Sequence, residues 1–161
     1  MKLIERTTYL SEMLELADTP DIKVITGVRR SGKSKLMETL AQKIVERQPD
    51  GNIIHINYNL TDFESIMEYR SMEAYVEERY APNRQNYLLI DEVQMCASFE
   101  KAINSLHARE KYSIFITGPN ASCKAATWQR CSWAGRTRFP STRSRLQSTW
   151  STSRLETSTT A

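Results

Sequence analysis

The sequence predicts an α/β fold in which a parallel sheet lies between two layers of helices, a three-layer sandwich. The first observation is that short apolar runs alternate with longer segments of helical periodicity along residues 1–121, an order typical of parallel sheets. The second is that polar residues follow these runs, where a parallel sheet presents its ligand-binding edge. With 161 residues, the chain is long enough to bury the core of one domain.

The individual elements follow from periodicity and from breaks in it. Leucine and methionine at helical spacing (Leu10, Met13, Leu14) predict the first helix. Turns around Pro20, Pro49 and Pro82 separate later elements. We expect helices over 5–17, 35–47, 62–80 and 98–109, and strands over 22–26, 52–58, 87–92 and 112–117.

The loop between the first strand and the next helix, residues 27–34, has the pattern GxxxxGKS of a phosphate-binding loop (Walker A). Glycines let successive backbone N–H groups point inward, and the following helix adds its positive N-terminal end. Lys33 would reach the β- and γ-phosphates, and the Ser34 hydroxyl would ligate Mg²⁺. The candidate nucleotide-binding residues are Gly27, Val28, Arg29, Arg30, Ser31, Gly32, Lys33 and Ser34. The motif predicts that the chain binds a nucleoside triphosphate.

A second motif, YLLIDE at residues 87–92, is an apolar strand that ends in two carboxylates, the Walker B pattern. Asp91 would hold Mg²⁺ through its water shell, because a hard cation prefers oxygen ligands. Glu92 would orient or deprotonate the water that attacks the γ-phosphate. An Asp-Glu pair alone could be a solvated loop, but the upstream phosphate loop favours the catalytic interpretation. The second acid favours an ATP hydrolase over a kinase-like transferase.

A third motif follows the strand at 112–117, where the chain continues Gly118-Pro119-Asn120. Asn120 fits a sensor that lies beside the γ-phosphate and helps to position water, and Thr117 is the second candidate for that role. The alternative is ordinary turn chemistry, since glycine, proline and asparagine favour turns.

Composition excludes several classes of protein. No apolar run approaches the length of a membrane span and no signal-peptide pattern is present, so we expect a cytoplasmic protein without a membrane partner. The three cysteines form no C-x-x-C pair, which argues against a disulfide framework or a zinc site. His55 alternates with apolar neighbours and is expected at the edge of the core.

The strings GVRRSGKS, YLLIDEVQ, FEKAINSL and YSIFITGPN, with the lead-in IERTTYL, resemble the AAA-type ATPases of bacteria and archaea. The resemblance covers about residues 1–121 and is greatest to the group with an Arg-Arg pair in the phosphate loop and a C-terminal domain of unknown function. It implies a P-loop NTPase fold, ATP and Mg²⁺ as ligands, and an oligomer in the intact parent. By the same resemblance, Gly32, Lys33 and Ser34 bind phosphate and Mg²⁺, Asp91 and Glu92 form Walker B, and Asn120 is the sensor. Arg29 and Arg30 would act at the nucleotide or an adjacent subunit, or form a solvated pair.

The resemblance is expected to end near Ala121, so that the family's fifth strand, lid and C-terminal domain are absent and the sheet is incomplete at the C-terminus. Residues 122–161 carry seven basic side chains and one acidic, with all three tryptophans. Read one base earlier, Trp and Cys codons become Leu, Met or Val codons. One permitted decoding of residues 122–136 begins FLQSSDLATLFVGR, similar to the stretch that follows the sensor strand in this group. A frameshift therefore explains the tail, and the rival interpretation is a disordered, basic, nucleic-acid-binding arm.

Three functional hypotheses remain open from the sequence. One is an ATP hydrolase that drives work on a protein or DNA partner, with slow or no turnover in this chain. Another is a nucleotide-gated binding module. The last is a non-functional fragment that aggregates through an exposed sheet edge.

Overall fold

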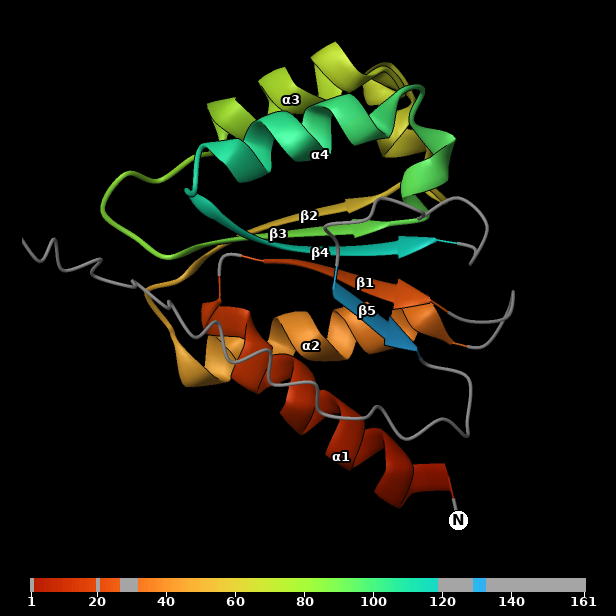
Figure 1. The fold of residues 1–161 in the computed structure, drawn as a ribbon, viewed down its shortest axis with the longest axis vertical. Helices are drawn as coiled ribbons and strands as arrows, with labels where there is room; N and C mark the ends of the chain where they lie inside the picture. The colour runs from red at the N-terminus through yellow and green to blue at the C-terminus, as the bar shows by residue number, and fades with distance from the viewer. Residues whose placement is uncertain (1, 20, 27–31, 119–128, 133–161) are drawn as a thin grey trace, which may run out of the picture.

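The computed structural model describes residues 2–19, 21–26, 32–118 and 129–132, with side chains from residue 9 to residue 118 within those ranges. A parallel sheet of five strands, in the order β2-β3-β4-β1-β5, forms the middle layer (Figure 1). The strands are β1 (Ile22–Thr26), β2 (Asn52–Asn57), β3 (Asn86–Asp91), β4 (Tyr112–Gly118) and β5 (Gln129–Ser132).

Helices cover both faces of the sheet. Helices α1 (Lys2–Glu15) and α2 (Lys33–Arg47) lie on one face, and α3 (Tyr69–Glu78) and α4 (Phe99–Ala108) lie on the other (Figure 1). Short 3-10 segments occupy Leu16–Asp18, Thr61–Ile66 and Val93–Met95. The predicted three-layer α/β sandwich is therefore confirmed. None of the described helices combines the length and apolar character needed to cross a membrane.

Strands β3 and β4 are buried along their whole length, which explains why their sequences are nearly continuous apolar runs. Successive side chains of β3 point to opposite faces of the sheet and so belong to two separate hydrophobic cores. Leu88 and Ile90 pack with α3 and α4, whereas Tyr87 and Leu89 pack with α1 and α2. Lys23 is a polar exception within β1: it is fully buried, and its ammonium group donates to Ser113 Oγ at 3.0 Å.

The predicted helix over 62–80 is wrong in one respect, because the structure divides it into the 3-10 segment Thr61–Ile66 and helix α3. The backbone at Glu68 is extended (φ −111°, ψ 148°) and forms an isolated parallel bridge with Ala97. The Ala97 N–H donates to the Met67 carbonyl at 2.6 Å, and the Tyr69 N–H donates to the Ala97 carbonyl at 3.1 Å. These distant partners interrupt the helix. The other element boundaries differ from the prediction by a few residues at most.

Strand β5 corrects the expectation that the fifth strand is absent. Its backbone pairs in parallel with β1, from Lys23 opposite Gln129 to Thr26 opposite Ser132 (Figure 1). Strand β1 therefore has a partner on both sides, and the edge beside it is not left open. The phosphate-loop residues 27–31, Asn120 and the rest of the tail lie outside the described residues.

Candidate functional site

The candidate site lies at the edge of the sheet where β1, β3 and β4 end (Figure 1). Parallel strands all present their carboxyl ends at the same edge. Asp91 ends β3, and Thr117 is the penultimate residue of β4. Lys33 begins α2, which follows the loop after β1. Sequence positions far apart along the chain are thereby brought to one place.

Gly32 sets the start of α2. Its backbone is left-handed (φ 84°, ψ 26°), a conformation that glycine adopts without the steric penalty of a β-carbon. Its carbonyl accepts a 3.0 Å hydrogen bond from the Leu36 N–H. Lys33 follows as the first helical residue, with only 5% of its side chain exposed, and Ser34 is half-buried. The helix N-terminus adds partial positive charge beside the lysine, an environment suited to an anion.

Asp91 has one engaged and one unengaged oxygen. Its side chain is fully buried, and Oδ1 accepts a hydrogen bond from the Thr117 hydroxyl. Oδ2 is buried and has no hydrogen-bond partner in the described part of the chain. A buried carboxylate oxygen without a partner is unfavourable, by about 1–3 kcal/mol or more. Oxygen donors of this kind suit the water shell of Mg²⁺, so Asp91 fits the metal-binding role that the sequence predicts.

Glu92 lies between the lysine and the end of β4. Its Oε1 is 3.9 Å from the Lys33 Nζ, and 23% of its side chain is exposed. Its Oε2 accepts a hydrogen bond from the Gln94 amide. The Glu92 backbone is left-handed (φ 55°, ψ 49°), a conformation that is unfavourable for a residue with a β-carbon and that often occurs at functional sites. A partly exposed carboxylate at this position can orient a water molecule or accept its proton.

Thr117 joins the two acids and does not extend toward a ligand. Its hydroxyl donates to Asp91 and accepts a 2.9 Å hydrogen bond from the Glu92 N–H. A hydroxyl has one hydrogen to donate, and Asp91 receives it. These contacts do not favour Thr117 as the sensor of a phosphate. Sequence reasoning missed this bridging role, which depends on β4 lying beside β3. It also missed Gln94, which lies in the 3-10 turn directly after Glu92.

His55 and Cys96 are two further titratable groups in the described part of the chain. His55 is half-buried on β2, as expected for the edge of the core, and burial lowers its pKa against the opposing effect of Asp91 and Glu38. Cys96 is a buried free thiol whose pKa is raised by burial. The described residues contain no cluster of three or more His, Cys, Asp or Glu side chains that could hold a metal ion.

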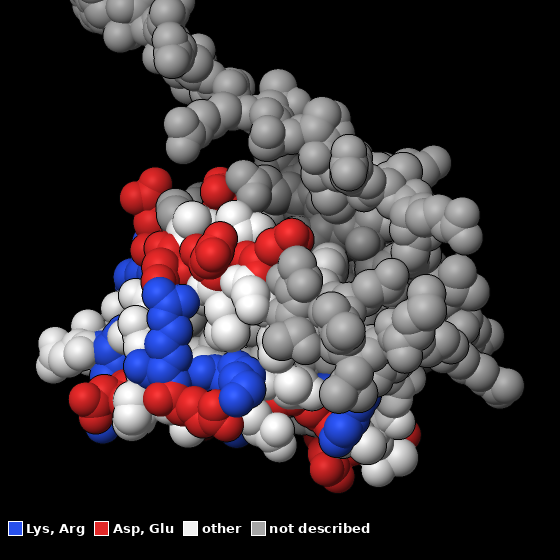
Figure 2. Space-filling view, turned by 90° about the horizontal axis from the view of Figure 1, so that it is seen from below, with Lys and Arg blue, Asp and Glu red and all other residues white. Residues whose placement is uncertain are grey.

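The face that carries α1 and α2 shows acidic and basic side chains close together in its described part (Figure 2). On α2, Lys35 pairs with Glu38 and Lys43 pairs with Glu46. These pairs do not form the one-sign basic surface that binds nucleic acid.

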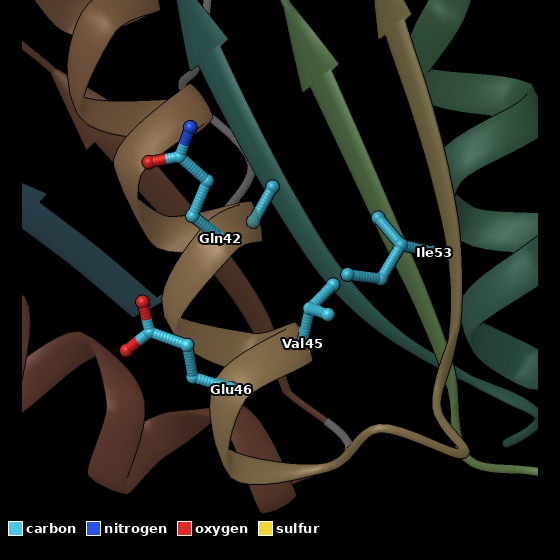
Figure 3. Close-up of a pocket in the computed structure, with 5 residues that line it drawn as sticks. Gln42, Val45, Glu46 and Ile53 are labelled. Carbon is cyan, nitrogen blue, oxygen red and sulfur yellow. The ribbon is translucent and has the colours of Figure 1, made fainter.

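A shallow hollow lies between α2 and β2, away from the carboxyl-edge site (Figure 3). Its lining is largely apolar and includes Val45, which is 51% exposed, and Ile53 at the sheet edge. It contains none of the predicted site residues.

Comparisons with known proteins agree with this arrangement. A family model described as an AAA domain matches residues 19–139, a range that continues past Ala121. An uncharacterised protein of Haemophilus influenzae is 32% identical over 125 residues, which are 74% of this chain and 30% of that protein. The chain thus spans less than a third of the length of this relative.

Two solved structures share the fold. The structure of PCH-2 from C. elegans has a TM-score of 0.59 at 18% identity, over 81% of this chain and 42% of that one. A chain of the Drosophila ORC structure bound to DNA has a TM-score of 0.55 at 10% identity, over 88% of this chain and 95% of that one. At these identities the likeness concerns the fold alone.

Proposed function

Because the chain belongs to the AAA domain family and has its P-loop ATPase core, we propose that its carboxyl-edge site binds ATP together with Mg²⁺. The observation that carries the proposal is the convergence of a nearly buried lysine at a helix N-terminus with two successive acids. One oxygen of the first acid is buried and has no hydrogen-bond partner among the residues that the structure describes. Cation and carboxylate so placed suit a phosphate–metal pair.

The proposed roles follow the chemistry of each group. Lys33 contacts the β- and γ-phosphates, while residues 27–31 and Gly32 supply backbone N–H groups to them. The Ser34 hydroxyl and Asp91 hold Mg²⁺, which offsets phosphate charge when it is bound. ATP, and not another nucleotide, is proposed from family membership.

Glu92 is the proposed general base. It would orient the attacking water and accept its proton, while Lys33 offsets the charge that develops on the γ-phosphate. Asn120 is proposed as the sensor of that phosphate. Turnover in this class often requires an arginine from a neighbouring subunit or domain, which the isolated chain does not receive. We therefore propose slow turnover by the isolated chain.

A nucleotide-gated binding module is the second candidate function, and a turnover that depends on an arginine from outside the chain would leave the chain in that state. In that case ATP occupancy alone would switch the interaction with a protein or DNA partner. One of the solved structures that share the fold was solved bound to DNA, and DNA enters here only as a candidate partner. The role of Glu92 distinguishes this candidate from a hydrolase.

Titration with a fluorescent ATP analogue in the presence of Mg²⁺ tests the proposed site. Lys33→Ala is expected to weaken binding at least about tenfold, because it removes the cation nearest the phosphates. Lys35→Ala is the matched control, since the Lys35 side chain is 74% exposed and forms its ion pair with Glu38, away from the site. Equal affinities of the two variants would contradict the proposal.

For the tail, we propose that the codons after Ala121 are read one base out of frame. Strand β5 reads Gln-Arg-Cys-Ser, whereas strands within parallel sheets are typically apolar. The shifted frame permits Ala-Thr-Leu-Phe at the same four positions. Sequencing of the coding DNA would reveal a missing base near the Ala121 codon. An intact frame would overturn this proposal, and it would be consistent with a family match that continues to residue 139.

A further inference from the structure

The two carboxylate oxygens of Glu92 have different neighbours. Oε1 lies 3.9 Å from the Lys33 Nζ, whereas Oε2 accepts a hydrogen bond from the side-chain amide of Gln94. The lysine that is proposed to contact the phosphates therefore faces one oxygen, and the amide holds the other. A carboxylate engaged at both oxygens loses its freedom to rotate about its terminal bond.

We infer that Gln94 is a positioning residue, whose amide holds Glu92 Oε2 so that Oε1 faces Lys33 and the phosphates. The inference rests on the proposed function, because it concerns how Glu92 directs water toward ATP. Gln94 touches neither the nucleotide nor the water in this account and acts through Glu92 alone. Its amide determines which carboxylate oxygen serves as the base.

The backbone around Gln94 is well suited to this role. Val93, Gln94 and Met95 form a 3-10 turn directly after Glu92. The Met95 N–H donates to the Glu92 carbonyl at 3.0 Å, and the Cys96 N–H donates to the Val93 carbonyl at 3.0 Å. The Val93 side chain is fully buried and anchors the turn in the core. A side chain that projects from such a closed, anchored turn can hold its partner in one geometry.

The side-chain oxygen of Gln94 makes it possible to test a positioning role separately from a contribution to stability. Its Oε1 is buried and has no hydrogen-bond partner among the described residues. A buried amide oxygen without a partner is unfavourable. Methionine, which has a similar length, would remove that oxygen together with the amide. Stability should therefore survive Gln94→Met, while the restraint on Glu92 should not.

Single-turnover hydrolysis provides the main test, with protein in excess over γ-labelled ATP and Mg²⁺ so that slow rates are measurable. Gln94→Met is expected to reduce the rate constant about tenfold or more, because a small displacement of the base is costly for the reaction. Its affinity for ATP and its thermal midpoint should match those of the unchanged chain. Gln42→Met makes the same chemical change on an exposed position of α2 and should alter none of the three quantities.

The outcomes separate the inference from the proposed function. An unchanged rate constant in Gln94→Met would overturn the inference, and so would a parallel loss of ATP affinity, which would place Gln94 in binding. Failure of the unchanged chain itself to bind ATP would overturn the proposed function.

A spectroscopic measurement tests the contact whether or not hydrolysis is detectable. The side-chain ¹⁵N–¹H resonances of Gln94 should shift in Glu92→Ala, because the amide loses its carboxylate acceptor. They should not shift in Glu38→Ala, which removes an exposed carboxylate that is paired with Lys35. Resonances that are unchanged in Glu92→Ala would overturn the inference.

Discussion

The Thr117 hydroxyl accepts a 2.9 Å hydrogen bond from the Glu92 N–H, and so ties β4 to the residue that follows β3. The same hydroxyl donates its hydrogen to Asp91 Oδ1. A single buried side chain therefore fixes both the proposed metal ligand and the proposed base, and it couples the geometry of the site to the stability of the fold.

Replacement of Thr117 by valine should destabilise the protein. Valine has nearly the same shape but leaves the Glu92 N–H and Asp91 Oδ1 without this partner, which should lower the free energy of unfolding by about 1–3 kcal/mol. Thr117→Ser keeps the hydroxyl, so its free energy of unfolding should decrease much less. Urea denaturation of the three proteins measures the difference. An equal decrease in the free energy of unfolding of the valine and serine variants would show that the methyl group, and not the hydroxyl, stabilises the protein.

The left-handed backbone at Glu92 predicts that the glycine variant is more stable than the alanine variant, the reverse of the usual order. A protein with alanine at a given position is normally more stable than one with glycine, but at φ 55° a β-carbon is unfavourable by about 1 kcal/mol or more. Glu92→Gly should therefore be more stable than Glu92→Ala, as measured by chemical denaturation.

Two other positions serve as controls for that order. Glu110 is also left-handed (φ 53°) and should show the same inversion, although it is exposed and lies outside the site. Asn104 is exposed within helix α4, where Asn104→Gly should be less stable than Asn104→Ala by about 1 kcal/mol. The normal order at Glu92 would argue against the left-handed conformation there.

Most of the fold could be predicted because its signals are local. The apolar runs of β3 and β4 each predict a buried strand, and the glycine-lysine-serine sequence at the start of α2 predicts a phosphate-binding helix N-terminus. Asp91 and Glu92 could be assigned to the site because a strand end determines their position. Each of these inferences needs only a short window of sequence.

What could not be predicted depends on contacts between distant residues. Helix α3 begins only after Glu68 because Ala97, far along the chain, holds the preceding backbone in an extended form. The link from Thr117 to both acids appears only when β4 lies beside β3. Strand β5 carries no apolar pattern, and its pairing with β1 had no local signal in the sequence.

The half-buried His55 predicts a pH-dependent component of stability. Burial lowers its folded-state pKa below the ordinary value of 6.5, so the unfolded chain binds the proton first as the pH falls. Stability from this group is therefore present above pH 6.5 and is lost below it. When the pH falls from 7.5 to 5.5, the free energy of unfolding of His55→Leu should decrease by less than that of the unchanged chain. An equal decrease in the free energy of unfolding of both proteins would contradict the assignment of this pH dependence to His55.

Glu92→Gln should separate a hydrolase from a binding switch. The amide keeps the size of the side chain but cannot accept a proton, so ATP should stay bound while single-turnover hydrolysis slows at least about a hundredfold. Persistence of bound, unhydrolysed ATP is measured by chromatography of the released nucleotide. A variant as fast as the unchanged chain would remove Glu92 from the chemistry and leave the nucleotide-gated module as the better account.

Calorimetric titration of the chain with ATP, with excess Mg²⁺ and again with EDTA, tests the central claim most directly. Lys33 and Asp91 are proposed to hold phosphate and metal together, so binding should be saturable with one ATP per chain and should weaken at least about tenfold without the metal. Absence of saturable binding in Mg²⁺, with a thermal midpoint that ATP does not raise, would contradict the assignment of this site to ATP.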